Sequence, residues 1–484
     1  METHRLYIGG EWQAASGGAT FDDFNPFTGE VFARAARGTR DDAARAVAAA
    51  AAAFPAWAAT PPGERRRILL KAADVLERRQ QDIAGILMEE TGATFGWSMF
   101  QLGFTPGLLR EAAAQAYGVV GEVFPADLPG ATFLALRQPV GVVAGFSPWN
   151  APLILSLRAV ALPIAYGNTT VLKPSEESPV VAGVVIAQVF EEAGLPKGVL
   201  NLLTHSREDA AAVGDELIGN PAVRRISFTG STEIGRIVAE KAGRHLKRVV
   251  LELGGKDPLL VLRDADVDYA VDAACFGSFL HQGQICMSTE RILVERPVAE
   301  EFTAKLAKKA ASLKVGDPKE PHTVIGPLIN RGAVEKVHAH VQDAIAKGAR
   351  VLTGGKHEGL CYHPTVVSDV RPEMKIFSEQ TFGPVAPVMV VEDVEQAIAV
   401  ANRSLYGLSA GVITRDLAKG LAIAERLDTG MVHVNDQSVH DEPQAPFGGV
   451  KGSGWGRLGG KAALEEFTEL RWISLQRTPR HYPF

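Results

Sequence analysis

The sequence predicts an α/β protein of two or more domains, in which parallel sheets are covered by helices. Its 484 residues are too many for one hydrophobic core. From Pro139 onward, short apolar runs alternate with helix-like segments, and the alternation resumes after Asp257. Strands that alternate with helices form parallel sheets, because each helix returns the chain to the start of the next strand. Two consecutive α/β units therefore fit the length.

The N-terminal part combines short strands with long helices. Strand-like pieces separated by turn signals such as Asn25-Pro26 extend to about Pro62. The alanine tract at 43–53 predicts a helix, because alanine has the highest helix propensity and acidic residues precede the tract. Apolar residues at helical spacing predict one longer helix over 64–90, which Thr91-Gly92 ends.

A series of apolar runs forms the predicted strands of the first sheet: 140–146, 169–172, 199–203, 225–228 and 248–253. Helices between them include 178–193 and 232–242. The second unit begins with a helix at 266–280, a strand at 291–294 and a helix at 299–312. Residues 467–476 alternate like a strand, whose apolar edge is covered either by a partner subunit or by its own domain.

Composition and charge narrow the class of protein. Hydrophobic residues make up 46% of the chain, the net charge is −6 and no basic run is present, so neither nucleic acid nor a membrane surface is expected as a partner. Three cysteines are too few for a disulfide framework and are typical of a reducing compartment. The first residues lack a signal-peptide core, and prolines interrupt the most hydrophobic stretch, 140–166, so we expect a cytoplasmic protein.

Several segments carry side chains suited to catalysis, and each also has a structural interpretation. Cys286 lies on a Gly-containing connection that can expose a thiol, although most cysteines are buried, as we expect for Cys275 and Cys361. Glu252 ends an apolar strand and is either a desolvated general base for water or the partner of a nearby lysine. Asn150 follows another strand and either donates to an oxyanion or caps the next helix.

Two turns have features of a nucleotide site. Lys173 and Glu176 follow the strand at 169–172, where such side chains can hold an adenosine ribose. Gly230-Ser231 leads into a helix whose N-terminal amides can receive a pyrophosphate. Neither turn is a G-x-G-x-x-G fingerprint. No residue cluster has the spacing of metal ligands, so no metal is expected, and no G-x-S-x-G motif is present.

Taken together, the motifs resemble the aldehyde dehydrogenase superfamily over essentially the whole chain. Segments occur in the family's order and at its spacings: FSPWNAP, VLKPSE, FTGSTEIG, LELGGK, GQIC, SEQTFGPV and PFGGVKGSG. The resemblance implies the aldehyde dehydrogenase fold, with a Rossmann-like coenzyme domain, an α/β catalytic domain and a small β oligomerisation arm. It implies an NAD-binding domain at 1–117 and 138–253, a catalytic domain at 254–452, an arm at 118–137 and 466–484, and a homodimer or homotetramer.

The resemblance also implies a mechanism. Cys286 attacks the aldehyde, Asn150 and the backbone amide of Cys286 hold the oxyanion, hydride passes to the nicotinamide, and Glu252 activates the water that hydrolyses the thioester. A thiol of ordinary acidity is mostly protonated at neutral pH, so the site is expected to help form the thiolate. The residues expected to bind the coenzyme are Ser147, Pro148, Trp149, Lys173, Ser175, Glu176, Gly230, Ser231, Gly254, Gln380 and Phe382.

The coenzyme prediction has two complications. Glu176 favours NAD, because a carboxylate repels a 2′-phosphate, but Lys173 softens the repulsion and NADP stays possible. Gln380 stands where the family usually has a carboxylate for the nicotinamide ribose, so we expect altered cofactor affinity rather than loss. Arg158 stands where the family often has lysine, and Leu458 replaces the acidic partner of that lysine, so the family's lysine–glutamate proton relay cannot be carried over.

Further segments, including NDQSVHDEPQ, resemble the branch that contains vanillin, benzaldehyde and salicylaldehyde dehydrogenases. The implied substrate is an aromatic aldehyde, and the apolar pocket would comprise Leu157, Leu280, Ile285, Met287 and Phe447. Arg158 either meets a phenol oxygen or carboxylate on the ring or makes a structural ion pair. An aliphatic or semialdehyde dehydrogenase with the same mechanism is the alternative. Glu252 argues against acyl transfer to coenzyme A, and the intact Cys286, Glu252 and Asn150 argue against a non-catalytic protein.

Overall fold

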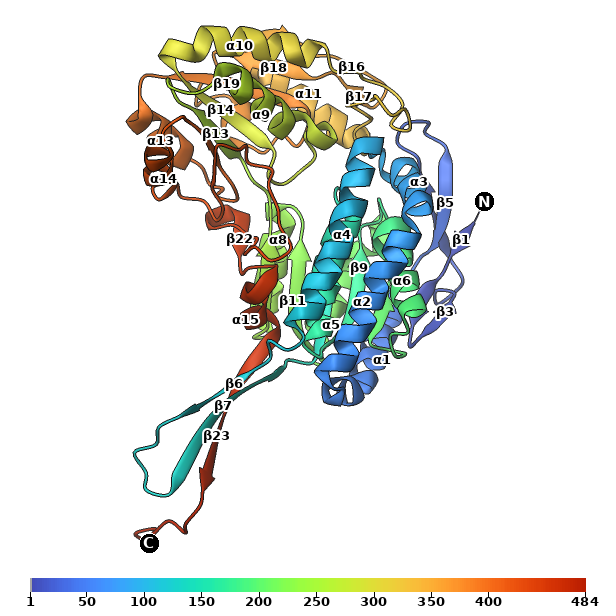
Figure 1. The fold of residues 1–484 in the computed structure, drawn as a ribbon. Coiled ribbons are helices and arrows are strands. Elements are labelled where there is room, and N and C mark those ends of the chain that lie inside the picture. Colours follow the sequence, from blue (N-terminus) through green and yellow to red (C-terminus); the bar gives the residue numbers. More distant parts are fainter. Residues whose placement is uncertain (1) are drawn as a thin grey trace.

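The computed structural model describes residues 2–484 as two sheet-and-helix lobes with a projecting three-stranded arm (Figure 1). The first lobe contains an eight-stranded sheet of order β22-β12-β11-β8-β9-β10-β2-β3. Its parallel centre consists of β8 (Val142–Ser147), β9 (Thr169–Pro174), β10 (Leu200–Leu202), β11 (Val223–Thr229) and β12 (Arg248–Glu252). These are the predicted strands, and their near-continuous apolar runs suit strands that are buried on both faces.

Antiparallel strands complete this sheet at both edges. They are β2 (Leu6–Ile8), β3 (Glu11–Gln13) and β22 (Gly454–Trp455). The N-terminal strands β1 (Thr3–His4), β4 (Thr20–Phe24) and β5 (Val31–Ala36) form a separate small sheet. Because β22 pairs with β12, a segment close to the C-terminus closes the sheet beside the strand that ends at Glu252.

The helices of the first lobe are α1 (Arg40–Ala59), α2 (Pro62–Arg78), α3 (Gln80–Thr91), α4 (Phe95–Gln115), α5 (Pro152–Ala165), α6 (Val185–Ala193), α7 (Ala210–Gly219) and α8 (Thr232–Arg244). The single helix expected over 64–90 is wrong: the chain leaves helical geometry at Arg79 (φ −97°, ψ 10°), whose amide closes the end of α2 on Leu76 and Val75. Gly92 ends α3 in the left-handed conformation, as its sequence position predicts.

The second lobe is built on a seven-stranded sheet of order β15-β18-β19-β14-β13-β20-β21. Its strands are β13 (Asp257–Val261), β14 (Thr289–Glu295), β15 (Arg350–Thr353), β18 (Thr365–Ser368), β19 (Val385–Val391), β20 (Gly411–Ile413) and β21 (His433–Val434). The larger helices are α9 (Val267–Phe279), α10 (Arg296–Ala311), α11 (Arg331–Ala346), α13 (Val394–Asn402) and α14 (Leu417–Ala424). All of these strands lie within the range predicted for the catalytic domain.

Short elements complete the second lobe: the hairpin β16 (His357–Glu358) and β17 (Cys361–Tyr362) and the helix α12 (Lys375–Ser378). The short helix α15 (Leu464–Phe467) packs on the core of the first lobe and leads into the arm. Among residues 2–484, no helix has both the length and the apolar character needed to cross a membrane.

The arm consists of β6 (Gly121–Phe124), β7 (Ala131–Pro139) and the C-terminal β23 (Thr468–Gln476). β23 pairs antiparallel with β7 along its whole length, from Thr468 opposite Pro139 to Gln476 opposite Ala131. The C-terminal strand therefore pairs with its own chain along one edge. Its large apolar side chains remain exposed, since Leu470 is 57% and Trp472 65% accessible.

Candidate active site

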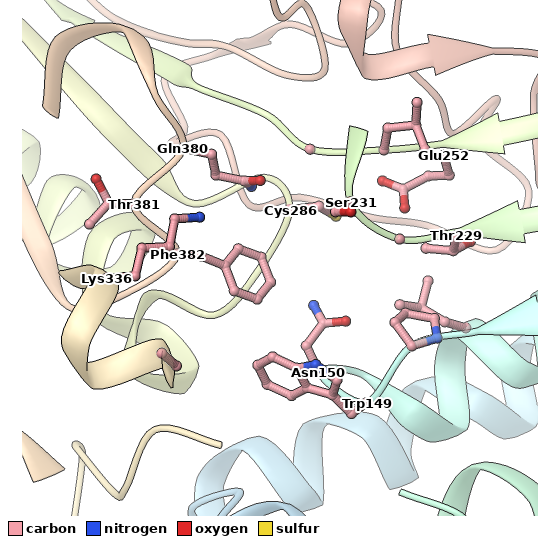
Figure 2. Close-up of a pocket in the computed structure, with 16 residues that line it drawn as sticks. Trp149, Asn150, Thr229, Ser231, Glu252, Cys286, Lys336, Gln380, Thr381 and Phe382 are labelled. Atoms are coloured by element: carbon pink, nitrogen blue, oxygen red, sulfur yellow. The ribbon is translucent and has the colours of Figure 1, made fainter. Parts of the chain in front are cut away.

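A cavity of about 250 Å³ lies between the two lobes, at the carboxyl ends of β8, β11 and β12 (Figure 2). In the first sheet the chain runs from β8 outward through β9 and β10 on one side and through β11 and β12 on the other, so the strand order reverses at β8. Ligands of open α/β sheets bind at such a switch point. The lining residues are Pro148, Trp149, Asn150, Leu155, Thr229, Gly230, Ser231, Glu252, Leu253, Gly254, Cys286, Ala333, Lys336, Gln380, Thr381 and Phe382.

Cys286 reaches this cavity from the connection between α9 and β14. Ahead of it, His281, Gln282 and Gly283 have φ values of 48°, 56° and 70°, a run of left-handed residues that turns the chain sharply. At Gly283 a Cβ would lie 2.2 Å from the carbonyl oxygen of Gly383, so only glycine fits there. The Gln282 side chain donates to the carbonyls of Gly92 (3.1 Å) and Pro327 (3.0 Å) and fixes the turn.

The other two thiols belong to the interior. Cys275 and Cys361 are buried, as the sequence predicts, whereas Cys286 is partly accessible and lines the cavity. Only a thiol that contacts the cavity can meet a substrate, so Cys286 is the candidate nucleophile among them.

Glu252 ends β12 with 2% of its surface exposed. Burial raises the pKa of its carboxyl to about 7, an effect that the Cys286 thiol and Arg158 oppose. Its Oε1 has no hydrogen-bond partner. The alternative of a lysine partner is wrong, because the adjacent Lys256 pairs with Glu290 at 2.6 Å instead. A carboxyl with a pKa near neutrality both accepts and releases protons at physiological pH.

Asn150 is fixed by two hydrogen bonds. Its Nδ2 donates to the carbonyl of Gln284 at 2.9 Å, and its own carbonyl accepts from the indole N–H of Trp97 at 3.1 Å. It does not cap α5, which has Ala151 at its N-cap and no side-chain cap, so the capping alternative is wrong. Since an amide nitrogen carries two hydrogens, the bond to Gln284 orients the group and leaves one donor for a ligand.

The thiol of Cys286 is held protonated rather than as a preformed thiolate. Burial and the neighbouring Glu252 carboxylate raise the pKa of the thiol well above its ordinary value. The surroundings therefore do not favour the thiolate, contrary to the expectation from the sequence. Instead, the Glu252 carboxyl lies beside the thiol, where it can take the proton as the sulfur bonds to a substrate.

The side of the cavity where the sequence predicts the coenzyme is lined by residues from both lobes (Figure 2). Ser231 is the N-cap of α8 and its hydroxyl accepts from the amide of Ile234 at 3.3 Å. The absence of a side chain at Gly254 lets the Gln380 amide approach, because a Cβ there would lie 2.4 Å from its oxygen. Phe382 meets Trp149 edge-on, with the ring centroids 5.7 Å apart.

The remaining predicted coenzyme residues lie outside this cavity wall, on β8, β9 and the turn after β9. Lys173 lies over the Phe146 ring, 5.7 Å from its centroid, and burial lowers its pKa to about 8. Ser175 donates to the carboxylate of Glu176 at 3.4 Å. Ser147 is buried and accepts from Ser156 at 2.8 Å. The structure thus places Lys173 and Glu176 together, one strand away from the nucleophile's cavity.

The predicted apolar pocket residues belong to the core cluster against which Cys286 packs. Leu157, Leu280, Ile285, Met287 and Phe447 belong to one apolar cluster with Cys286, although none of them lines the cavity wall. Leu155, which the sequence reasoning missed, does line it.

Arg158 is buried and makes an ion pair. Its Nη2 donates to both carboxylate oxygens of Asp441, at 2.5 and 2.6 Å. The guanidinium also lies 4.2 Å from the centroid of the Phe447 ring. Its Nε and Nη1 are buried without a partner. Arg158 follows Leu155 by one helical turn, and Asp441 lines a second cavity of about 400 Å³ with the aromatic rings of Phe100, Tyr269 and Phe276.

Several site residues escaped the sequence reasoning, although three of them stand inside the quoted motifs. Thr229, Lys336 and Thr381 line the cavity, and Trp97 and Asp441 contact residues that were predicted. Thr229 precedes Gly230 in FTGSTEIG, Thr381 stands between Gln380 and Phe382 in SEQTFGPV, and Asp441 lies in NDQSVHDEPQ. Their places in these motifs could have identified them, whereas nothing in the sequence marks Trp97 or Lys336.

Comparisons with known proteins agree with this geometry. The family model described as aldehyde dehydrogenase family matches residues 12–473. Vanillin dehydrogenase from Pseudomonas fluorescens is 51% identical over 481 residues, with 99% of each chain covered. Benzaldehyde dehydrogenase [NAD(+)] from Pseudomonas putida is 45% identical over 474 residues, covering 98% of this chain and 96% of the relative. The crystal structure of a salicylaldehyde dehydrogenase from Pseudomonas putida G7, complexed with salicylaldehyde, superposes with a TM-score of 0.98 at 43% identity, with both chains fully covered.

Fold, cavity and relatives define an oxidoreductase that acts on aldehydes. The chain belongs to the aldehyde dehydrogenase family, as its motifs predict, and carries out NAD(P)-dependent oxidation of an aldehyde to the acid.

Proposed function

We propose that this enzyme oxidises an uncharged aromatic aldehyde with NAD, through a thioester on Cys286. The observation that carries the proposal is that Cys286, Asn150 and Glu252 line one cavity while an apolar cluster packs against the nucleophile. The names of the relatives support an aryl substrate, since they are vanillin, benzaldehyde and salicylaldehyde dehydrogenases.

The first chemical step joins the sulfur of Cys286 to the carbonyl carbon. The thiol proton passes to Glu252, and the free amide hydrogen of Asn150 and the backbone amide of Cys286 stabilise the oxyanion. When bound, the nicotinamide would accept hydride from the carbon attached to Cys286, and this oxidation converts the adduct to a thioester. Glu252 then releases the thiol proton to solvent and takes a second proton from water. The hydroxide adds to the thioester carbon, the C–S bond breaks, and the sulfur of Cys286 takes the proton from Glu252 as the acid is released.

The cavity fits the nicotinamide end of the coenzyme. Gln380 lines it with a buried Nε2 that has no partner, a donor suited to a ribose hydroxyl. Gly254 provides room where a side chain would collide with that amide. At the other end, the carboxylate of Glu176 would repel a 2′-phosphate, which favours NAD over NADP. Burial lowers the pKa of the neighbouring Lys173 to about 8, so its ammonium still carries its charge at neutral pH and offsets part of that repulsion.

Arg158 and Asp441 bear on the class of substrate. Both carboxylate oxygens of Asp441 are engaged by Arg158, so the pair adds no net positive charge that would attract a carboxylate-bearing semialdehyde. The unpartnered Nε and Nη1 of Arg158 remain as donors. Because Asp441 balances the charge of the guanidinium, its two free N–H groups suit a phenol oxygen. Arg158 can therefore both make the ion pair and recognise a hydroxyl on the aryl ring.

A panel of aldehydes tests the proposed substrate and coenzyme. We expect benzaldehyde, vanillin, 4-hydroxybenzaldehyde and salicylaldehyde to give kcat/KM at least about 10-fold above acetaldehyde and succinic semialdehyde, because an apolar pocket discriminates by the ring area it buries. Reduced coenzyme absorbance is the measurement, made with NAD and repeated with NADP. Equal or better turnover of the aliphatic compounds would contradict the aryl assignment and leave the dehydrogenase intact.

The variant Arg158→Lys is assayed with the same panel of aldehydes. Lysine keeps a cation for Asp441 but removes the two free donors, so hydroxybenzaldehydes should lose about 3- to 10-fold in kcat/KM relative to benzaldehyde, the value of one hydrogen bond. Asp441→Asn is the matched control, because it removes the ion pair and keeps the donors. Unchanged discrimination in Arg158→Lys would leave Arg158 with its structural role alone.

We infer that the arm binds a second copy of this chain, in a homodimer or homotetramer. β23 is paired on one side only, and its exposed Leu470 and Trp472, two residues apart and so on the same face of the strand, form an apolar patch that a monomer would leave in water. Light scattering should therefore give the mass of two or four chains, and Trp472→Glu should lower it. A monomeric mass for the unmodified chain would contradict the inference.

A further inference from the structure

A buried ion pair holds the loop at 380–382, which forms the coenzyme side of the cavity. Glu290 and Lys256 are 2% and 1% exposed, and Lys256 Nζ donates to Glu290 Oε2 at 2.6 Å. The same Oε2 accepts from the backbone amide of Thr381 at 2.7 Å, while Oε1 accepts from the amide of Phe382 at 2.8 Å. Lys256 also donates to the hydroxyl of Thr381 at 3.3 Å. One carboxylate thus binds two successive amides.

The loop needs such a constraint because its backbone is strained. Phe382 has a φ of +57°, in the left-handed region that a bulky side chain avoids. A conformation of this kind persists only where its surroundings over-determine it. Fixed by Lys256, the two oxygens of Glu290 impose the direction of both amides and therefore the orientation of the Phe382 ring.

The orientation matters because the cavity wall depends on it. Phe382 meets Trp149 edge-on at 5.7 Å, and Gln380, two residues earlier, presents its unpartnered Nε2 to the cavity. Both contacts would shift if the amides of Thr381 and Phe382 turned. We propose that Glu290, held by Lys256, is a positioning residue that sets the nicotinamide-binding wall. This inference rests on the proposed placement of the nicotinamide beside Gln380 and Phe382.

The chemistry of the clamp requires a carboxylate. An ionised carboxylate only accepts hydrogen bonds, so both of its oxygens can face N–H donors. A glutamine offers one oxygen and an NH₂ group, which would point hydrogen against hydrogen at one of the two amides. Glu290→Gln therefore keeps the volume of the side chain and removes half of the clamp.

The test measures NAD binding apart from catalysis. In Glu290→Gln, the dissociation constant of NAD, followed by quenching of tryptophan fluorescence, should rise about 10- to 100-fold, because one buried amide of the loop loses its acceptor. Hydrolysis of a nitrophenyl ester uses Cys286 and Glu252 but no nicotinamide. NAD-dependent oxidation should therefore fall at least about 10-fold further than ester hydrolysis, since a misplaced reactant slows only its own step.

Glu295→Gln is the matched control. Glu295 lies at the other end of β14, is 1% exposed, and likewise binds a backbone amide and a cation, here the amide (2.7 Å) and guanidinium (2.9 Å) of Arg263. Its substitution should leave NAD affinity unchanged. If Glu290→Gln does not fold, Lys256→Met/Glu290→Gln, which leaves no unpaired buried charge, is measured instead. NAD affinity equal to that of Glu295→Gln would overturn the inference.

Gln380→Ala and Phe382→Ala separate this inference from the proposed function. If neither weakens NAD binding, the nicotinamide does not lie where we place it, and the proposed coenzyme site and the clamp both fail. If they weaken it and the Glu290 variants do not, the coenzyme placement stands and the clamp alone is wrong.

Discussion

Cys286→Ser should abolish aldehyde oxidation, with a loss in kcat/KM on the order of 10⁴-fold or more, as for removal of a nucleophile. A hydroxyl is far less acidic than a thiol, and Glu252, with a pKa of about 7, is too weak a base to take its proton. The measurement is NADH formation with benzaldehyde. Mass spectrometry should at the same time detect no acyl adduct on the variant.

Cys361→Ser is the control for Cys286→Ser. Cys361 lies in the hairpin of β16 and β17, away from the cavity, so its substitution should leave turnover unchanged. Folding of both variants is verified by thermal unfolding. Substantial turnover in a folded Cys286→Ser protein would remove Cys286 from the mechanism.

Glu252→Gln should lower steady-state turnover by about 10²- to 10⁴-fold, the contribution of a general base. An amide cannot take a proton from water, so the thioester on Cys286 should accumulate after a single slow turnover. Mass spectrometry of the Cys286 peptide detects this adduct, and the released NADH should equal the enzyme in amount. The variant should be no less stable than the parent at pH 8, because ionising a buried carboxyl opposes folding.

The pH profile provides an independent test of the same residue. The base form of Glu252 is the deprotonated one, so turnover limited by hydrolysis should rise between pH 6 and 8 and level off above its pKa of about 7. In Glu252→Gln this inflection should disappear. A variant that keeps the inflection, or hydrolyses the thioester at the parent's rate, would assign the base to another group.

The sequence alone determined the α/β class, the parallel order of most strands and the family, because these depend on local patterns. Apolar runs interrupted by helical segments specify buried parallel strands, and the family motifs follow the carboxyl ends of those strands. Asn150 comes after β8, Ser231 after β11 and Gly254 after β12. Since parallel strands end at one edge of the sheet, motifs far apart in the chain were expected to meet.

Only the tertiary structure decided which polar groups pair with one another. The sequence placed a lysine four residues after Glu252 and left their pairing open, but Lys256 turns to Glu290 and leaves Glu252 unpaired. Arg158 meets Asp441 across 283 positions of sequence, which no spacing reveals. The division of the helix at 64–90 also has no marker, because arginine at Arg79 is an ordinary helix former.

The physical reason is the range over which each interaction acts. Helix propensity, strand periodicity and turn chemistry act between near neighbours and can be recognised in the printed chain. The raised pKa values of Glu252 and Cys286, the free donors of Arg158 and the clamp on Phe382 arise from burial between two lobes, where each buried charge takes whichever partner the packing brings near. Local motifs therefore identify the candidate catalytic residues, whereas the folded structure sets their protonation states and orientations.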